Sequence, residues 1–129
     1  MLILINQYNG KYFEFINRFR SLTGKNFKIQ GTGNEIRSFI YIKDFLNAFD
    51  AILKRGKHLN IYNIGTSEKI KIKNLAYKLS KIFKKKITLK KTPLAKGGTK
   101  VRLPNINKIK KLGFKPKFNL DKGLRKTLI

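Results

Sequence analysis

Apolar side chains recur along this 129-residue chain with two periods, one typical of helices and one typical of strands. Spacings of three and four residues, which mark one buried helical face, predict helices over 12–22, 43–55, 73–83, 106–113 and 119–128. Short runs rich in β-branched and aromatic residues predict strands over 1–6, 27–30, 36–42, 59–65 and 87–91. Helices that alternate with strands indicate an α/β or α+β unit.

The helix over 43–55 carries the clearest apolar face. The residues on this face are Phe45, Leu46, Phe49, Ile52 and Leu53. Apolar residues at these spacings line one side of a helix. Asp44 falls in the first turn, where a negative charge suits the helix dipole.

Length and composition exclude several classes of protein. A chain of this length is enough for one domain, and 41 % hydrophobic residues can build a core. There is no cysteine, so disulfides and thiolate metal sites are excluded, and the single histidine, His58, has no cluster of ligands around it. No apolar run reaches the roughly 18 residues of a membrane span, and the opening residues lack the charged start of a secretion signal. We therefore expect a cytoplasmic protein without a metal site.

The net charge of +25 is unevenly distributed. Residues 1–68 hold ten basic and five acidic residues, whereas residues 69–129 hold 21 basic and one acidic residue. Such a charge can attract nucleic acid. The 25 lysines accompany 12 asparagines and 17 isoleucines, and only six arginines. Lys, Asn and Ile all have A/T-rich codons, and selection for phosphate binding gives no reason to enrich Ile, so drift of the genome toward A/T is the favoured explanation of the composition.

Four motifs in a fixed order carry a resemblance to a known family. They are GTGNEIRSFIYIKDF at 31–45, IYNIGT at 61–66, GGTKVRLPNINKIKKLGFKP at 97–116 and LDKGLRKT at 120–127. This order resembles the C-terminal, substrate-binding part of the NAD-dependent nucleotide-sugar epimerases and dehydratases, which are extended short-chain dehydrogenases. The resemblance implies an α/β fold class: a small mixed sheet with helices and an incomplete Rossmann part. Residues 1–129 would then form a single partial domain, from which the N-terminal cofactor domain is missing.

The resemblance assigns two arginines to the substrate. Arg37 follows the glycine turn, and Arg102 lies two residues before a proline. In the family, arginines at these positions reach the diphosphate of the sugar nucleotide from opposite sides of a cleft. The chemistry agrees, because a guanidinium group forms bidentate contacts with phosphate oxygens.

The glycine turn itself is expected to be structural. Gly31 and Gly33 suit a chain reversal, because positive φ is cheap only for glycine, and the resemblance gives Asn63 and Gly65 a similar role at a strand end. The family commonly has an aromatic residue, which lines the nucleoside pocket, where this chain has Gln30. We therefore expect the nucleoside contacts to come from Phe27, Ile29 or Gln30.

Two features of the intact family are absent from this chain. Its NAD-binding glycine fingerprint opens a helix directly after a strand, whereas the GTG turn leads into a predicted strand. Its catalytic pair is Tyr-x-x-x-Lys, and the one match, Tyr77 with Lys81, lies after the YNIG motif and thus in the wrong half of the pattern. We therefore predict no catalytic residue and no cofactor bound by this chain alone, with NAD the cofactor of the intact family.

Three functions remain open at this stage. The first is the nucleotide-sugar-binding portion of an enzyme like the UDP-glucose 4-epimerases, inactive alone, whose partner is a separate cofactor-domain polypeptide or another copy of this chain. The second is a small lysine-rich nucleic-acid-binding protein. The third is a non-catalytic interaction module, in which the YNIG strand presents an unpaired edge to a partner.

Overall fold

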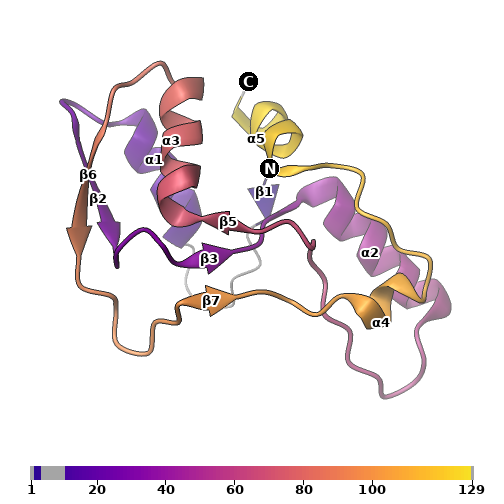
Figure 1. Cartoon of the computed structure of the whole chain (residues 1–129). Coiled ribbons are helices and arrows are strands. Elements are labelled where there is room, and N and C mark those ends of the chain that lie inside the picture. Colours follow the sequence, from indigo (N-terminus) through magenta and orange to yellow (C-terminus); the bar gives the residue numbers. More distant parts are fainter. Residues whose placement is uncertain (1, 4–10, 129) are drawn as a thin grey trace. The chain divides into compact units, whose positions relative to one another are not determined.

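The computed structural model describes the backbone of residues 2–3 and 11–128, and the side chains of residues 16–128 (Figure 1). The predicted strand over 1–6 therefore lies largely outside the described residues. The strands are β1 (Leu2–Ile3), β2 (Asn26–Gln30), β3 (Ile36–Arg37), β4 (Ile40–Tyr41), β5 (Ile70–Lys71), β6 (Thr88–Thr92) and β7 (Val101–Arg102). The helices are α1 (Lys11–Arg20), α2 (Ile42–Arg55), α3 (Ile72–Ile82), α4 (Asn107–Lys110) and α5 (Leu120–Leu128).

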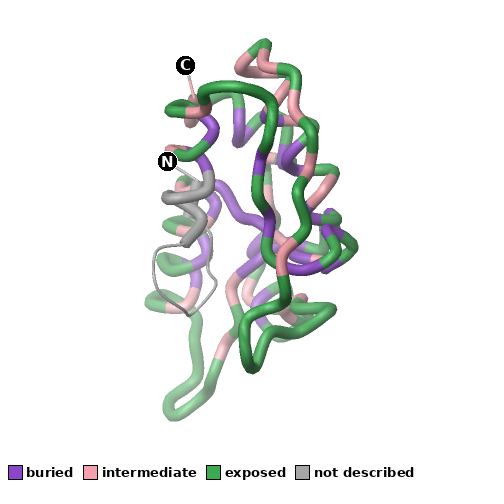
Figure 2. Tube along the Cα trace, turned by 90° about the vertical axis from the view of Figure 1, so that its left-hand side faces the viewer, coloured by how far each residue is buried: buried purple, intermediate pink, exposed green. Residues whose placement is uncertain are grey.

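The chain divides into two compact units, each built from segments that are distant in sequence. The first unit comprises Met1–Asn6, Ser38–Lys69 and Leu103–Ile129, and it contains β1, β4, α2, α4 and α5. The second unit comprises Gln7–Arg37 and Ile70–Arg102, and it contains the remaining helices and strands. Figure 2 shows that buried residues occur in short stretches between exposed ones, as amphipathic elements require.

Two small sheets organise the second unit. Strands β2 and β6 pair in parallel, with Phe27 opposite Leu89. Strand β3 lies between β5, its antiparallel neighbour, and β7, its parallel neighbour. Burial alternates along β2, so its apolar side chains face the core and its polar side chains face solvent.

Aromatic packing and one lysine tie helix α1 to this unit. The rings of Phe19 and Phe27 lie 4.0 Å apart between centroids, and both side chains are fully buried. The ammonium group of Lys85 donates to the carbonyl oxygens of Phe19, Arg20 and Leu22, at 3.0, 2.8 and 3.2 Å. A cation at a helix C-terminus satisfies carbonyl groups that have no partner within the helix, so Lys85 fixes the end of α1.

The core of the first unit lies between α2, α4 and the segments that flank them. Its buried residues are Ile40, Ala48, Ala51, Ile106, Ile109 and Phe114. Gly65 belongs to the same unit, where a side chain in its place would collide with the ring of Pro104. The side chain of Asn63 donates to the carbonyl oxygen of Asn105, at 3.3 Å.

A buried carboxylate holds the C-terminal segment against α2. Asp44 is completely buried, and its Oδ2 accepts the backbone N–H groups of Lys117 and Phe118, at 2.9 and 2.8 Å. The ring of Phe118 then packs on Tyr41, with 4.6 Å between centroids. Each of these charge-assisted hydrogen bonds is stronger than a neutral one, so Asp44 is a fixed point of the first unit.

One strand prediction is wrong in part and another is wrong. The run over 36–42 forms two separate short strands, β3 and β4, and residues 59–65 form no strand at all. Within the described part of the chain, residues 61–65 make no backbone–backbone hydrogen bond. A strand requires a partner, so an apolar β-like sequence alone does not produce one.

The predicted apolar face of α2 is only partly buried. The buried residues of α2 are Asp44, Ala48 and Ala51, and Phe45 and Ile52 pack against the core from its border. Leu46, Phe49 and Leu53 are exposed. The side of α2 that faces the core is therefore centred on Ala48 and Ala51, with Phe45 and Ile52 at its border.

We predict that Asp44→Ala destabilises the protein strongly, by about 3 kcal/mol, because the partly buried N–H groups of Lys117 and Phe118 lose their acceptor. The free energy of unfolding from urea titration, followed by circular dichroism, measures the change. The control is Asp50→Ala, since Asp50 forms only an exposed ion pair with Lys54, and we expect it to cost less than about 0.5 kcal/mol. Equal losses in the two variants would contradict the role of Asp44.

Candidate functional site

The glycine turn is closed by a carboxylate. Gly31 and Gly33 have φ angles of +81° and +85°, which are strained for residues with a side chain. The Glu35 carboxylate accepts hydrogen bonds from the N–H of Thr32 (3.0 Å), the hydroxyl of Thr32 (3.2 Å) and the N–H of Gly33 (2.8 Å). A side chain at Gly31 would collide with this carboxylate. The turn is therefore shaped around Glu35.

Glu35 is 6 % exposed, and its pKa is lowered. Burial alone would raise the pKa, but hydrogen bonds from the backbone of Thr32, from its own backbone and that of Gly33, and from the Thr32 hydroxyl outweigh this effect. The carboxylate therefore stays charged and remains an acceptor for the turn.

This turn does not fit a dinucleotide. The backbone N–H groups of Thr32 and Gly33, which would face a pyrophosphate in a phosphate-binding loop, are bonded to Glu35. The element that follows is strand β3, and no helix begins there. A phosphate cradle requires free N–H groups at a helix N-terminus, so no part of the NAD chemistry is assigned to this turn.

Arg37 lies directly after the turn, on the central strand β3. Its side chain is 8 % exposed. Nη2 donates to the carbonyl oxygen of Thr99 (2.8 Å), and Nη1 donates to those of Ile36 (2.8 Å) and Lys100 (3.5 Å). Nε is buried and has no hydrogen-bond partner among the described residues. Since a guanidinium group has five N–H donors, Nε–H and one Nη2 donor remain for another acceptor.

Arg102 is the register partner of Arg37. Strands β3 and β7 run parallel, with Arg37 opposite Arg102. Side chains that are directly opposite in a sheet project from the same face, so both arginines lie on one face of the three-stranded sheet. This differs from the expected arrangement on opposite sides of a cleft.

The three nucleoside candidates differ in exposure. Phe27 and Ile29 are 1 % and 2 % exposed and belong to the core of the second unit. Gln30 is exposed at the end of β2. The burial of Phe27 and Ile29 leaves no surface for a nucleobase, so only Gln30 remains as a candidate contact.

The other residues with candidate chemistry are on the surface. Tyr77 and Lys81 are exposed on α3, and His58 is exposed in the segment after α2. No group of three or more His, Asp or Glu residues suited to a metal occurs in the described part of the chain. Among the described helices, none has the length and apolar character to span a membrane.

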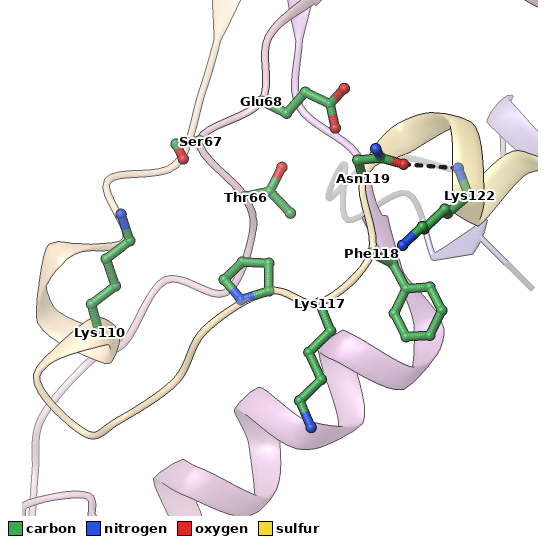
Figure 3. Close-up of a pocket in the computed structure, with 9 residues that line it drawn as sticks. Thr66, Ser67, Glu68, Lys110, Lys117, Phe118, Asn119 and Lys122 are labelled. Atoms are coloured by element: carbon green, nitrogen blue, oxygen red, sulfur yellow. Dashed lines mark hydrogen bonds between the residues drawn. The ribbon is translucent and has the colours of Figure 1, made fainter.

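A shallow pocket of about 350 Å³ lies in the first unit (Figure 3). Lys110, Lys117 and Lys122 line it together with Glu68, and neither Arg37 nor Arg102 does. Glu68 accepts the N–H of Leu120 at 2.7 Å, and Asn119 accepts that of Lys122 at 2.9 Å. The first N–H groups of α5 are thus bonded to the protein's own acceptors, which argues against an anion site at this helix end.

Three side chains that bind several backbone groups were not predicted from the sequence: Glu35, Asp44 and Lys85. For Glu35 there was a signal, since a carboxylate two residues after a Gly-x-Gly turn is within reach of the N–H groups of the turn. For the other two there was none, because Asp44 bonds residues more than 70 positions away and Lys85 bonds residues more than 60 positions away.

Comparisons with known proteins identify the relatives of this chain. Residues 6–65 match the sequence model of the NAD dependent epimerase/dehydratase family. Bovine dTDP-D-glucose 4,6-dehydratase is 34 % identical over 124 residues, covering 88 % of this chain. A trifunctional UDP-glucose 4,6-dehydratase/UDP-4-keto-6-deoxy-D-glucose 3,5-epimerase/UDP-4-keto-L-rhamnose-reductase of Arabidopsis thaliana is 31 % identical over 84 % of the chain.

This chain is a relative of the NAD-dependent epimerases and dehydratases. It superposes on UDP-glucose 4-epimerase of Thermotoga maritima, solved with UDP-glucose, with a TM-score of 0.77, 27 % identity and 96 % of this chain covered. UDP-glucuronic acid 4-epimerase of Bacillus cereus, solved with UDP-glucuronic acid and NAD, gives a TM-score of 0.74 at 28 % identity over 85 % of this chain. These matches confirm the resemblance and the predicted α/β fold class.

The chain spans only part of these relatives. It matches 17 % of the length of the Arabidopsis protein and 34 % of the bovine one. It covers 42 % of the Thermotoga enzyme and 35 % of the Bacillus enzyme. More than half of each relative therefore has no counterpart in these 129 residues.

We predict that Glu35→Gln lowers stability at pH 7 and flattens the dependence of stability on pH. Because the folded pKa of Glu35 lies below the unfolded value of about 4.3, its contribution is present above that pH and is lost as pH falls through the folded pKa. Urea unfolding between pH 7 and pH 2.5 gives both curves. Asp50→Asn, at an exposed carboxylate, is the control. Curves for wild type and Glu35→Gln that run parallel would contradict the prediction.

Proposed function

We propose that this chain is the nucleotide-sugar-binding portion of an NAD-dependent epimerase or dehydratase, in which Arg37 and Arg102 hold the diphosphate of the substrate. The observation that carries the proposal is the pairing of the two arginines in register on β3 and β7, together with the buried Nε–H of Arg37, which finds no hydrogen-bond partner in the part of the chain that the structure describes. Buried polar groups normally have hydrogen-bond partners, so an unpaired guanidinium donor beside a second arginine favours an anionic ligand.

The hydrogen bonds of Arg37 suit this role. Three carbonyl oxygens, those of Ile36, Thr99 and Lys100, hold two nitrogens of its guanidinium group. A side chain fixed in this way loses little rotamer freedom when a ligand binds, which favours affinity. The donors that remain, Nε–H and one on Nη2, lie on adjacent nitrogens, as bidentate contact with a phosphate group requires.

The relatives support the class of substrate. The Thermotoga and Bacillus enzymes were solved with UDP-glucose and UDP-glucuronic acid, and each ligand carries a diphosphate between a nucleoside and a sugar. Gln30 is the candidate for the nucleoside contact, because its side chain is exposed near the glycine turn.

Catalysis and NAD binding, in this proposal, require residues outside these 129. The glycine turn is occupied by Glu35, and Tyr77 and Lys81 lie on the exposed surface of a helix. The chain alone is thus expected to bind its substrate without converting it, and a cytoplasmic location is part of the proposal.

We expect UDP-glucose to bind the chain and Arg102→Gln to weaken this binding about tenfold to a hundredfold, since a charged hydrogen-bonded contact contributes about 1.5–3 kcal/mol. Isothermal titration calorimetry at 50 mM salt measures the dissociation constant. Arg20→Gln, which removes the same charge from an exposed position on α1 of the same unit, is the control. Arg37→Lys should also weaken binding, because lysine keeps the charge and loses the planar donors.

Equal affinity for UDP-glucose in Arg102→Gln and Arg20→Gln would contradict the proposal.

The net charge of +20 in residues 69–129 supports a second candidate function, nucleic-acid binding. The same titration with a single-stranded oligonucleotide tests it. Affinity for the oligonucleotide that falls steeply with salt, without measurable UDP-glucose binding, would favour the second candidate.

A further inference from the structure

The side of helix α3 that faces away from its core carries an aromatic ring between two lysines. Lys73, Tyr77 and Lys81 follow one another at spacings of four residues, so they form one row along the helix. Tyr77 and Lys81 are exposed, and Lys73 is half-buried. The buried residues of the helix lie on its other side and are Ile72, Leu75, Ala76 and Leu79. The row is therefore not part of the core.

The ring of Tyr77 is available for stacking. Among the phenylalanine and tyrosine side chains that the structure describes, only those of Tyr77 and Phe49 are exposed, at 47 % and 48 %. A half-exposed tyrosine offers a flat apolar surface to a ligand while its hydroxyl group stays in water. Packing within the second unit thus leaves the position of this ring unexplained.

Positive charge is concentrated in the unit that contains α3. The second unit holds 18 basic and two acidic residues, whereas the first unit, of nearly equal length, holds 13 and four. One of the two carboxylates of the second unit, that of Glu35, is buried in the glycine turn. Drift toward A/T acts on the whole chain, so it does not account for the difference between the units. A surface of this charge attracts anions.

Lys84 adds a third cation in the turn directly after α3. Its φ angle is +52°, in a region that favours glycine, and the chain has glycine at five other positions with positive φ. The N–H of Lys84 donates to the carbonyl oxygen of Lys81 at 3.2 Å, and the N–H of Lys85 donates to that of Ser80 at 2.9 Å. These bonds hold the turn against the last turn of the helix. A lysine in a strained position that glycine would occupy without strain favours a use for its charge.

We propose that this side of α3 binds single-stranded nucleic acid, with Tyr77 stacked on a base and with Lys73 and Lys81 on phosphate groups to either side. At a rise of about 1.5 Å per residue the two lysines are about 12 Å apart along the helix axis, which leaves room for a nucleotide over the ring. A single strand fits better than a duplex, because its bases are accessible for stacking on aromatic side chains. The inference rests on the second candidate function, gives it a site, and uses no residue of the nucleotide-sugar proposal.

The test is fluorescence anisotropy of a short labelled single-stranded DNA, titrated with the full 129-residue chain. Tyr77→Ala should weaken binding about tenfold, because the stacked ring is lost while alanine preserves the helix. Tyr77→Phe retains the ring and should bind like the wild type. Lys81→Gln should lower the slope of log affinity against log salt by about 0.7, which corresponds to one phosphate contact of a single strand.

The matched controls lie on α2, in the first unit. Phe49→Ala removes a ring of equal exposure, and Lys43→Gln removes an exposed lysine. Phe49→Ala should leave the affinity for DNA unchanged, and Lys43→Gln should leave the salt slope unchanged. Inorganic polyphosphate, which has the charges of a nucleic acid and no bases, should bind equally to Tyr77→Ala and to the wild type.

Two results would overturn the site on α3 and leave nucleic-acid binding as a candidate function. One is DNA binding with equal affinity in Tyr77→Ala and Phe49→Ala. The other is an equal loss of affinity for DNA and for polyphosphate in Tyr77→Ala, which would show that the ring does not contact bases. No measurable binding of DNA to the wild type would overturn both the site and the candidate function, without bearing on UDP-glucose binding.

Discussion

The structure depends on carboxylates that hold backbone N–H groups where the chain turns or one segment meets another. Glu35 closes the glycine turn, Asp44 fixes the C-terminal segment on α2, and Glu68 binds the first N–H of α5. These three are half of the six acidic residues in a chain with 31 basic ones. Because each accepts hydrogen bonds that no basic or apolar side chain could accept, lysine could not replace the carboxylate at these positions.

The glycine turn links this constraint to the candidate site. By fixing Thr32 and Gly33, Glu35 sets the point at which β3 begins, and β3 places Arg37 beside Arg102. Arg37 in turn holds the carbonyl oxygens of the segment that leads into β7. The arginine is thus a structural residue and a candidate ligand for phosphate at once, which explains why lysine would be a poor replacement in an otherwise lysine-rich chain.

The local pattern of apolar residues was sufficient to predict the helices. It was insufficient to predict which segments pair with one another as strands. Apolar spacing located α2 and α3 to within a residue or so, because helical hydrogen bonds are made within the helix itself. The prediction of a strand over 59–65 was wrong, since the hydrogen bonds of a strand must come from another segment. The strands β5 and β7 have only two residues each, too few to give a periodic pattern in the sequence. That Arg37 lies opposite Arg102 is seen only in the structure, because 65 positions separate them in the sequence.

Lys85 shows that the many lysines of this protein are not chemically equivalent. Its ammonium group is enclosed by three carbonyl oxygens at the end of α1, whereas most of the other lysines described are exposed. Acetylation would remove the charge at any of them, and at Lys85 it would also remove the donor that holds the end of α1. Amine-reactive labelling should therefore modify Lys85 more slowly than the exposed lysines, and the extent of its modification reports whether α1 is still docked.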